Sequence, residues 1–299
     1  SKTGITPVNK KQRSLWQEVY RRFKKNKLAV ISIIFLISLS IIAFSTIVID
    51  IVTDQAIYKE YVIKQDLRNR LLEPNSKHIF GLDEFGRDMF LRMLWGIRYS
   101  LFMGIIAIGF STIVGTILGA LAGYYGRISD NIIMRFMDIL LAIPSMLLAT
   151  AIVAALGPGL VNVLIAIAIA YVPTFARTVR ASVLTTKDLE YIEAARAVGA
   201  KDVRIIFKYI IPNSLAPLIV QSTLGVAGAI LSIAGLSFLG LGIQPPTPEW
   251  GSMLSNARTY IRDAWHITVF PGLGIMLTIL ALNLVGDGLR DALDPKLKN

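Results

Sequence analysis

Cysteine is absent from this 299-residue sequence, which excludes disulfides, thiolate catalysis and cysteine-based metal sites in any compartment. Histidine is nearly absent too: His78 and His266 lie far apart without metal-ligand spacing, and both are expected to be solvated loop residues. No Gly-Lys-Ser/Thr triplet occurs, and no GxGxxG pattern follows a strand, so the usual phosphate and dinucleotide loops are excluded. The sequence therefore predicts a chain without catalytic or ATP-binding machinery of its own.

Charge is scarce, at 17% of residues, while 54% are hydrophobic and the mean hydropathy is +0.59. A soluble domain of this composition would struggle to cover its surface with polar groups. The apolar residues form uncharged runs, and the first, as a helix, would be about 33 Å long against a hydrocarbon core of roughly 30 Å. That run is too long for the core of a signal peptide. Runs able to span a bilayer lie near 28–49, 101–122, 133–156, 160–176, 214–236 and 268–287. We expect an all-α membrane protein of about six transmembrane helices.

The basic residues fix the orientation of these helices. With the N-terminus inside, the inner segments hold 20 of the lysines and arginines and the outer segments hold 10. Eight acidic residues in segment 50–98 bring the outer face close to neutral. This positive-inside pattern predicts an N-in, C-in topology. The net charge of +11 could also suggest nucleic acid, but the basic residues follow the inner segments and form no aromatic-interleaved RNA-binding motif.

This topology divides the chain into a cytoplasmic leader, a first span, an outer segment, a core and a tail. The leader (1–27) carries Trp16, Val19, Tyr20 and Phe23 at helical spacing among basic residues, which predicts an amphipathic helix on the inner membrane surface. The other divisions are the first transmembrane helix at 28–49, the extracytoplasmic segment at 50–98, a five-helix core at 99–290 with a long inner loop at 177–213, and a cytoplasmic tail at 291–299.

Features inside the spans indicate close packing and bending more than ion transport. Gly115, Gly119 and Gly123 recur every four residues and predict a face that a neighbouring helix approaches closely. Pro144 and Pro173 are expected to interrupt the third and fourth spans.

Ionisable residues are few within the spans. Arg135 with Asp138, and Asp287 with Arg290, are three residues apart near inner helix ends, where local pairing explains them. A secondary transporter would need deep ionisable sites and internal repeats, so the energy source is expected in another polypeptide.

The inner loop at 177–213 is longer than a simple connection and carries helix-terminating residues. Asp188 is expected to cap a helix over Leu189 to Val198 that ends at Gly199, and Asp202 to cap a second helix that stops at Pro212. One face of the first helix would present Tyr191, Ala194, Ala195 and Val198. Small residues there permit seating in a groove of another protein, and the alternative is an amphipathic helix resting on lipid.

The same loop resembles the EAA loop of ABC importer permeases, through Glu193, Ala194, Ala195, then Gly199 and Pro212. In that family the loop forms a coupling helix that sits in a cleft of the ATP-hydrolysing subunit. The resemblance assigns coupling to Glu193, Ala194, Ala195 and Gly199. Tyr209 and Ile211 stand where the pattern more often has isoleucine and leucine.

Two further stretches resemble the second, C-type permease of the dipeptide, oligopeptide and nickel importers. The first runs from Gly81 through Asp83, Gly86, Arg87 and Asp88 to Arg92, Gly96, Arg98 and Ser100, with Leu82 and Leu91 in place of the usual threonine and serine. The second comprises 238–242, 245–251 with Pro245, Pro246 and Trp250, 270–272 and 283–295.

The resemblance implies a type I ABC importer permease fold in the inner membrane of a prokaryote, as a non-catalytic subunit that forms half of a pathway for peptides. It implies four kinds of partner: a homologous second permease, two ATPase subunits that hold ATP and Mg²⁺, an extracytoplasmic solute-binding protein, and membrane lipid. A nickel-chelate importer of the same family and a self-contained secondary transporter are the alternatives.

The outer segments suggest a hypothesis about the solute-binding protein. Residues 81–98 are charged, and Pro-Pro-Thr-Pro makes part of 244–265 stiff and extended. Both segments are expected to receive the binding protein or to gate the outer mouth, with Asp83, Gly86, Arg87, Asp88, Arg92, Pro245, Pro246 and Trp250 as candidates.

Overall fold

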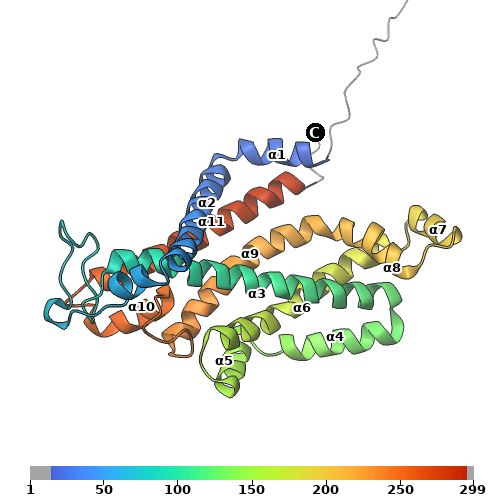
Figure 1. Cartoon of the computed structure of the whole chain (residues 1–299). Helices are drawn as coiled ribbons and strands as arrows, with labels where there is room; N and C mark the ends of the chain where they lie inside the picture. Colours follow the sequence, from blue (N-terminus) through green and yellow to red (C-terminus); the bar gives the residue numbers. More distant parts are fainter. Residues whose placement is uncertain (1–14, 295–299) are drawn as a thin grey trace, which may run out of the picture.

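The computed structural model describes residues 15–294, and the described chain is helical, without strands, as expected (Figure 1). The longer helices are α1 (Leu15–Lys25), α2 (Lys27–Val52), α3 (Met89–Tyr125), α4 (Arg127–Leu141), α5 (Ser145–Leu156), α6 (Leu160–Thr186), α9 (Ile211–Phe238) and α11 (His266–Leu293). The shorter ones are α7 (Glu190–Ala197), α8 (Asp202–Ile205) and α10 (Trp250–Ala257), with single turns at Tyr58–Val62, Leu67–Asn69, Ile206–Ile210 and Arg258–Tyr260.

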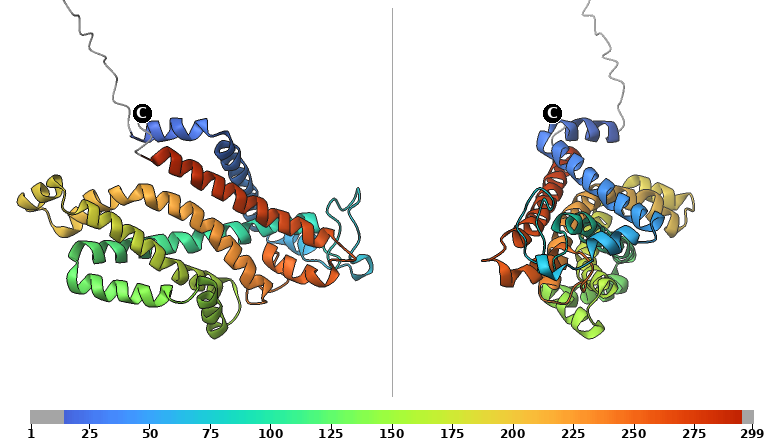
Figure 2. Two further views of the ribbon diagram at one scale, coloured as in Figure 1. Left: turned by 180° about the vertical axis from the view of Figure 1, so that it is seen from behind. Right: turned by 60° about the vertical axis from the view of Figure 1, so that its left-hand side comes forward.

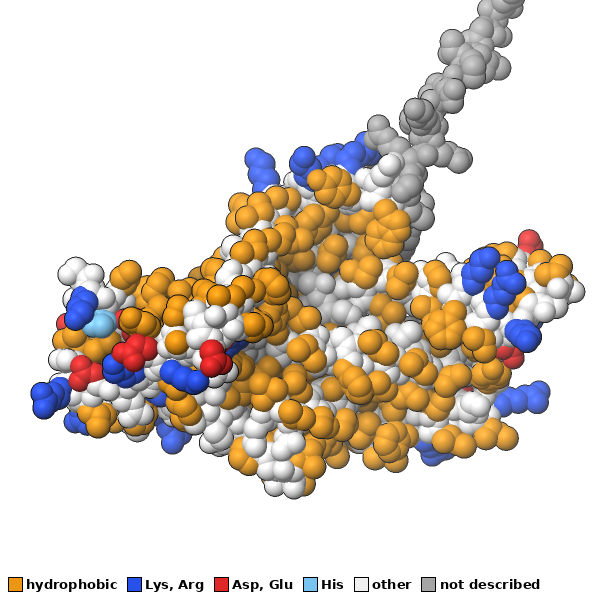
Figure 3. Space-filling view, in the orientation of Figure 1, with side chains coloured by type: hydrophobic (Ala, Val, Ile, Leu, Met, Phe, Trp, Pro, Cys, Tyr) orange, Lys and Arg blue, Asp and Glu red, His pale blue; other side chains and the backbone are white. Residues whose placement is uncertain are grey.

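The long helices α3, α6 and α9 pack together as the centre of the molecule, with α4 and α5 on one side and α2 and α11 on the other (Figures 1 and 2). The segment between α2 and α3 and helix α10 gather at one end of the molecule, and α7 lies at the opposite end. In Figure 3 the body between these ends is covered by apolar side chains, and the charged ones gather at the extremities and along α1. This distribution suits a body immersed in lipid with two aqueous faces.

Within the described residues, five helices are long and apolar enough to span a bilayer, and the pair α4–α5 makes a sixth if it is one broken span. Six apolar runs were expected, and the second begins earlier than expected, because α3 already starts at Met89. Of the predicted leader, residues 1–14 lie outside the described part, as do residues 295–299 of the tail. The remainder of the leader forms α1, with Trp16 and Tyr20 exposed and Val19 buried.

Proline affects the third and fourth spans differently. The interruption predicted at Pro144 is confirmed, and the axes of α4 and α5 differ by 88° there. Pro144 precedes the first turn of α5, a position where its missing N–H leaves no helical bond unmade. Pro173 does not end the fourth span, because α6 runs through that residue. Pro173 is buried, and close packing by neighbouring helices lets a membrane helix tolerate proline.

The glycine face of α3 packs directly on α6, as predicted. A methyl group added at Gly115 would lie 2.5 Å from the Cβ of Phe175, and one at Gly119 would lie 2.3 Å from the carbonyl oxygen of Ala176. A methyl group added at Gly123 would lie 2.8 Å from the Cβ of Val183. Only glycine permits this helix spacing, so these three residues, called the glycine seam below, fix α3 against α6.

Ion pairs tie α4 to α6 at two levels. Asp130 accepts two hydrogen bonds from Arg180, at 2.5 and 2.6 Å, and Asp138 pairs with Arg177 at 2.6 Å. The expectation that Asp138 pairs with Arg135 within its own helix is therefore wrong. The break at Pro144 lays α4 alongside α6, which brings a partner from another helix within reach of Asp138.

We predict that Gly119→Ala destabilises the protein by about 1–3 kcal/mol, because the added methyl group would overlap the backbone of α6. Thermal unfolding of the purified chain in mild detergent measures this. Gly109→Ala on the same helix is the matched control, because nothing lies within 4 Å of a Cβ added there. Equal melting temperatures for the two variants would contradict the close approach.

Candidate functional site

The inner candidate site is the hairpin formed by α7 and α8. Leu189, in an extended conformation, precedes α7, so the expected cap at Asp188 is wrong by one residue and no side chain caps this helix. The helix ends where predicted: Gly199 has a φ of +80°, and its N–H donates to the carbonyl oxygen of Arg196 at 2.9 Å. The N–H of Ala200 donates to the carbonyl oxygen of Ala195 at 3.0 Å, which closes a glycine-ended helix terminus.

The second helix of the hairpin does not stop at Pro212. Helix α8 begins at Asp202 after Lys201, which occupies the cap position that Asp202 was expected to fill, and it passes through the π turn Ile206–Ile210 into α9. Pro212 lies in the first turn of α9, where a missing N–H is tolerated. The side-chain amide of Asn213 donates a hydrogen bond to the carbonyl oxygen of Tyr209, four residues earlier.

The two faces of α7 differ from the expected pattern. Tyr191, Ala194 and Val198 point outward, and Val198 is 84% exposed. Ala195, which was expected on that face, is only 8% exposed and lies beside the fully buried Ile192. The i, i+3 spacing from Ile192 turns Ala195 toward the body of the protein, since α7 must bury one apolar stripe of its own.

Of the four residues assigned to coupling, Glu193, Ala194 and Gly199 are exposed and Ala195 supports the hairpin from inside. Gly199 lies at the tip with nothing within 4 Å of its missing Cβ. The exposed small and apolar side chains of α7 form a surface on which another protein can sit closely.

Polar contacts that no sequence motif marks join this hairpin to the membrane helices. The Tyr124 hydroxyl, at the inner end of α3, donates to the Asp202 carboxylate at 2.7 Å, and the Arg196 guanidinium lies 5.3 Å from the centre of the Tyr124 ring. On the other side, the Asn213 amide donates to the Tyr191 hydroxyl at 3.1 Å. No sequence motif marks Tyr124, because its partners are more than 70 residues away.

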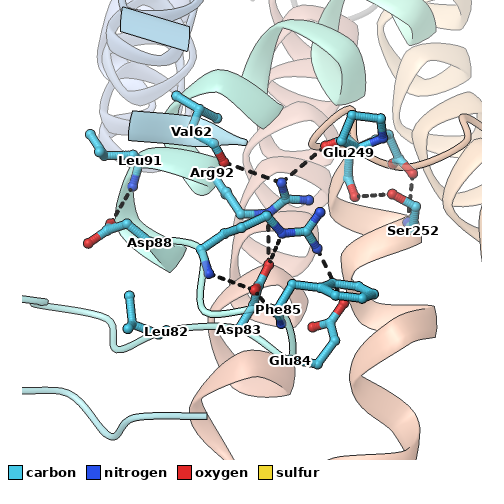
Figure 4. Close-up of polar contacts among 12 residues, drawn as sticks. Val62, Leu82, Asp83, Glu84, Phe85, Asp88, Leu91, Arg92, Glu249 and Ser252 are labelled. Carbon is cyan, nitrogen blue, oxygen red and sulfur yellow. Dashed lines mark hydrogen bonds and ion pairs between the residues drawn. The ribbon is translucent and has the colours of Figure 1, made fainter. Parts of the chain in front are cut away.

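The outer candidate site is a buried cluster around Asp83 (Figure 4). Its carboxylate accepts from the Nε of Arg87 at 2.6 Å and from the Arg87 backbone N–H at 2.9 Å, and it lies 3.2 Å from the Nε of Arg92. Both arginines are only 2% exposed. Arg87 also pairs with Glu84 at 3.3 Å, and burial raises the pKa of the Glu84 carboxyl. We call Asp83, Glu84, Arg87 and Arg92 the outer cluster.

Arg92 joins this cluster to distant parts of the chain. Its guanidinium donates to the carbonyl oxygen of Pro246 at 3.1 Å and reaches that of Val62 at 3.5 Å. It thereby links the start of α3 to the loop before α10 and to the segment after α2. A guanidinium suits this role because its donors point in several fixed directions.

The loop that presents the outer cluster has its own local requirements. Gly86 has a φ of +73°, and a methyl group there would lie 1.9 Å from the carbonyl oxygen of Asp66. Asp88 caps α3 by accepting from the Leu91 N–H at 3.0 Å, and it contacts the Nδ1 of His78 at 2.8 Å. The turn therefore requires glycine at position 86, and the start of α3 favours aspartate at position 88.

Glu249 and Trp250 anchor α10. The Glu249 carboxylate is buried and accepts from the N–H groups of Gly251 and Ser252, each at 2.8 Å, and burial raises its pKa. Trp250 is 2% exposed, donates to the carbonyl oxygen of Met93 at 3.1 Å, and fills the space beside Gly96.

The expected outer-face residues thus separate into two groups. Asp83, Arg87 and Arg92 are buried together and Trp250 is buried against α3, so these side chains organise the outer end from within. Pro245 and Pro246, joined by a cis peptide bond, are exposed.

His266 was expected to be a solvated loop residue, which is wrong: it is fully buried, with its Nε2 3.1 Å from the carbonyl oxygen of Leu82. Folding of α11 against the 81–88 loop covers this ring, and neither composition nor spacing indicates that contact. Within residues 15–294, no group of three or more His, Cys, Asp or Glu residues could hold a metal ion.

We predict that Arg92→Gln lowers the stability of the protein by about 3 kcal/mol, because it breaks a buried ion pair and leaves the Pro246 carbonyl oxygen without its donor. The melting temperature in detergent measures this. Arg70→Gln, at an exposed position in the same outer segment, is the matched control. A melting temperature lowered no further in Arg92→Gln than in Arg70→Gln would show that the outer cluster is not structural.

Two family models match the sequence. Residues 115–299 match the binding-protein-dependent transport system inner membrane component, and residues 14–74 match the N-terminal transmembrane domain of oligopeptide transport permease C.

Curated relatives match over most of the chain. A dipeptide transport system permease protein DppC of Alkalihalophilus pseudofirmus is 52% identical over 96% of this chain and 91% of its own length. A di/tripeptide permease protein DppC of Pseudomonas aeruginosa is 51% identical over 80% of this chain and 81% of its own, and a glutathione permease protein GsiD of Pectobacterium atrosepticum is 46% identical over 97% and 94%.

A solved structure has the same fold. It is an inward-facing MetNI methionine ABC transporter, and the match covers 69% of this chain and 98% of that chain, with a TM-score of 0.56 at 19% identity. This likeness shows the type I ABC importer permease fold that was expected.

Proposed function

This chain belongs to the family of inner membrane components of binding-protein-dependent transport systems, and we propose that it forms one half of the pathway of an importer for short peptides. It is a multi-pass inner membrane permease of the C-type peptide group, and ATP hydrolysis in such importers belongs to separate subunits. Family membership also sets aside the self-contained secondary transporter. The proposal concerns the substrate, the coupling residues and the composition of the complex.

Peptides are the class of substrate that the relatives share. The dipeptide, di/tripeptide and glutathione permeases named above all act on short chains with amide bonds, since glutathione is itself a tripeptide. Nickel chelates do not appear among the relatives described here. Selection among peptides would depend on the solute-binding protein as well as on this chain.

The exposed face of α7 is the observation that carries the coupling role. In this proposal an ATPase subunit receives Tyr191, Ala194 and Val198 in a cleft, beside Glu193, and ATP and Mg²⁺ are bound in that partner. The well-formed helix end at Gly199 keeps α7 rigid, which a lever between two proteins requires. Two ATPases and a homologous second permease would complete the membrane complex.

The outer end would receive the solute-binding protein. The exposed Pro245 and Pro246 offer a stiff contact, and the outer cluster behind them holds the loop in place through Arg92. In this arrangement Arg87 and Arg92 act as positioning residues and do not themselves touch the partner, because they are buried.

The substrate class is tested by uptake of a labelled dipeptide into cells that carry the native chain, compared with cells lacking it. We expect uptake to be lost without the chain and to be inhibited by unlabelled di- and tripeptides. Uptake inhibited by a nickel chelate and unaffected by peptides would overturn the peptide assignment and leave the importer assignment intact.

We predict that Gly199→Val impairs ATP-driven uptake by about tenfold or more, because a β-branched residue is strained at a φ of +80° and the end of α7 would rearrange. Gly199→Asn is the matched control, since asparagine tolerates this conformation and is expected to retain most of the uptake. The assay is peptide uptake by the reconstituted complex, with copurified ATPase measured alongside. Normal coupled transport by Gly199→Val would contradict the coupling role of this turn.

A second test concerns the exposed face of α7. The tagged chain, purified from its native membranes in mild detergent, is expected to bring a second permease and two ATPases with it. Val198→Glu places a charge on an apolar, 84% exposed position and should reduce recovery of the ATPases only. Undiminished recovery would place the ATPase contact elsewhere.

A further inference from the structure

Helix α3 connects the two candidate sites as one uninterrupted element. It contains 37 residues and no proline, which corresponds to a length of about 55 Å. Arg92 lies in its first turn, inside the outer cluster, and Tyr124 lies in its last turn, against the α7–α8 hairpin. The glycine seam holds its inner half on α6. A continuous helix without proline can transmit a displacement from one end to the other, because sharp bends require specific causes.

The contact at the inner end involves both helices of the hairpin. Asp202 of α8 accepts the Tyr124 hydroxyl at 2.7 Å, while Arg196 of α7 lies over the Tyr124 ring at 5.3 Å. Arg196 precedes Gly199 and Asp202 follows it, so Tyr124 contacts the chain on both sides of the hairpin tip. Tyr125 packs edge-to-face on Tyr124 at 5.2 Å and is itself half exposed.

The contact at the outer end involves the loop proposed to meet the binding protein. Arg92 donates to the carbonyl oxygen of Pro246 at 3.1 Å and pairs with Asp83 at 3.2 Å. A displacement of α3 along its axis would therefore change the position of the 245–246 loop.

We infer that Tyr124 is a positioning residue that transmits movement of the α7–α8 hairpin to α3, and that α3 carries this movement to the outer cluster and the Pro245–Pro246 loop. The inference rests on the proposed coupling role of α7. It adds a specific route, through a tyrosine outside the motif that identified the hairpin. Because coupling free energies are reciprocal, docking at the outer loop would act on the ATPase face through the same contact.

A competing route runs through α9, which continues from α8 through the π turn and is tied to the hairpin by Tyr191 and Asn213. The two routes predict different sensitive residues. If α3 carries the movement, removal of the Tyr124 hydroxyl reduces stimulation and removal of the Asn213 amide does not, since Asn213 lies on α9 and outside the surface proposed to meet the ATPase. If α9 carries it, the reverse holds.

The experiment uses the whole complex in lipid nanodiscs and measures ATP hydrolysis with and without peptide-loaded binding protein. Tyr124→Phe keeps the ring and its contact with Arg196 and removes only the hydroxyl. We expect unchanged copurification and basal hydrolysis, with stimulation by the binding protein reduced about two- to tenfold, the range of one hydrogen bond. Tyr125→Phe is the matched control on the same helix turn and should leave stimulation unchanged.

Asp202 provides the other half of a double-mutant cycle. Asp202→Ala should reduce stimulation as Tyr124→Phe does, and the double variant should be no worse than either, because both remove one contact. Asp202→Asn retains an acceptor oxygen and should restore part of the stimulation.

Three outcomes would overturn the inference: stimulation unchanged in Tyr124→Phe, additive effects in the double variant, or loss confined to Asn213→Ala. These failures leave the proposed coupling role of α7 standing if Gly199→Val still impairs uptake. Conversely, normal uptake in Gly199→Val would remove the proposed function on which this route rests.

Discussion

The packing of α3 on α6 through the glycine seam is the contact on which the rest of the structure depends. Lipid offers no hydrophobic driving force for joining two apolar helices, so close backbone approach and dispersion must hold them. Gly115, Gly119 and Gly123 make that approach possible. Since α3 ends in the outer cluster at one face and at the hairpin at the other, and α6 leads directly into α7, this seam sets the spacing of both sites.

The outer cluster shows how charge can serve as internal structure outside the membrane. A buried carboxylate is tolerated only when hydrogen bonds and opposite charges replace its water, and Asp83 has both. The arrangement fixes a loop that would otherwise have little apolar surface to bury. A charged segment in the sequence is therefore not necessarily a charged surface, and here the exposed part of the outer end is partly formed by prolines.

The inner hairpin differs from the outer cluster in the side chains that it exposes. Its outward surface is exposed and mostly apolar or small, while buried Ile192 and Ala195 and polar contacts at Tyr124, Tyr191 and Asn213 join it to the rest of the protein. In the proposed coupling role, these contacts would keep the shape of the hairpin and join its movement to the membrane helices.

The sequence by itself determined the class of the protein: an all-α membrane chain with its basic surplus on one side, a glycine face on the second span, a break at Pro144 and a glycine-ended helix in the inner loop. These features are local, because hydropathy, helix periodicity and the conformational freedom of glycine act over a few turns of chain. Together with the family resemblance, they were sufficient to propose a coupling role for the inner loop and a docking role for the outer segments.

Only the tertiary structure decided which side chains face inward. It buried Ala195, Arg87, Arg92 and His266, moved the partner of Asp138 to Arg177, and placed Tyr124 against Asp202, 78 residues away. The continuation of α8 into α9 through Pro212 was likewise settled by packing, since a π turn absorbs a proline that local rules treat as a stop. Burial and pairing depend on which segments meet, and residues distant in sequence meet only once the helices have packed.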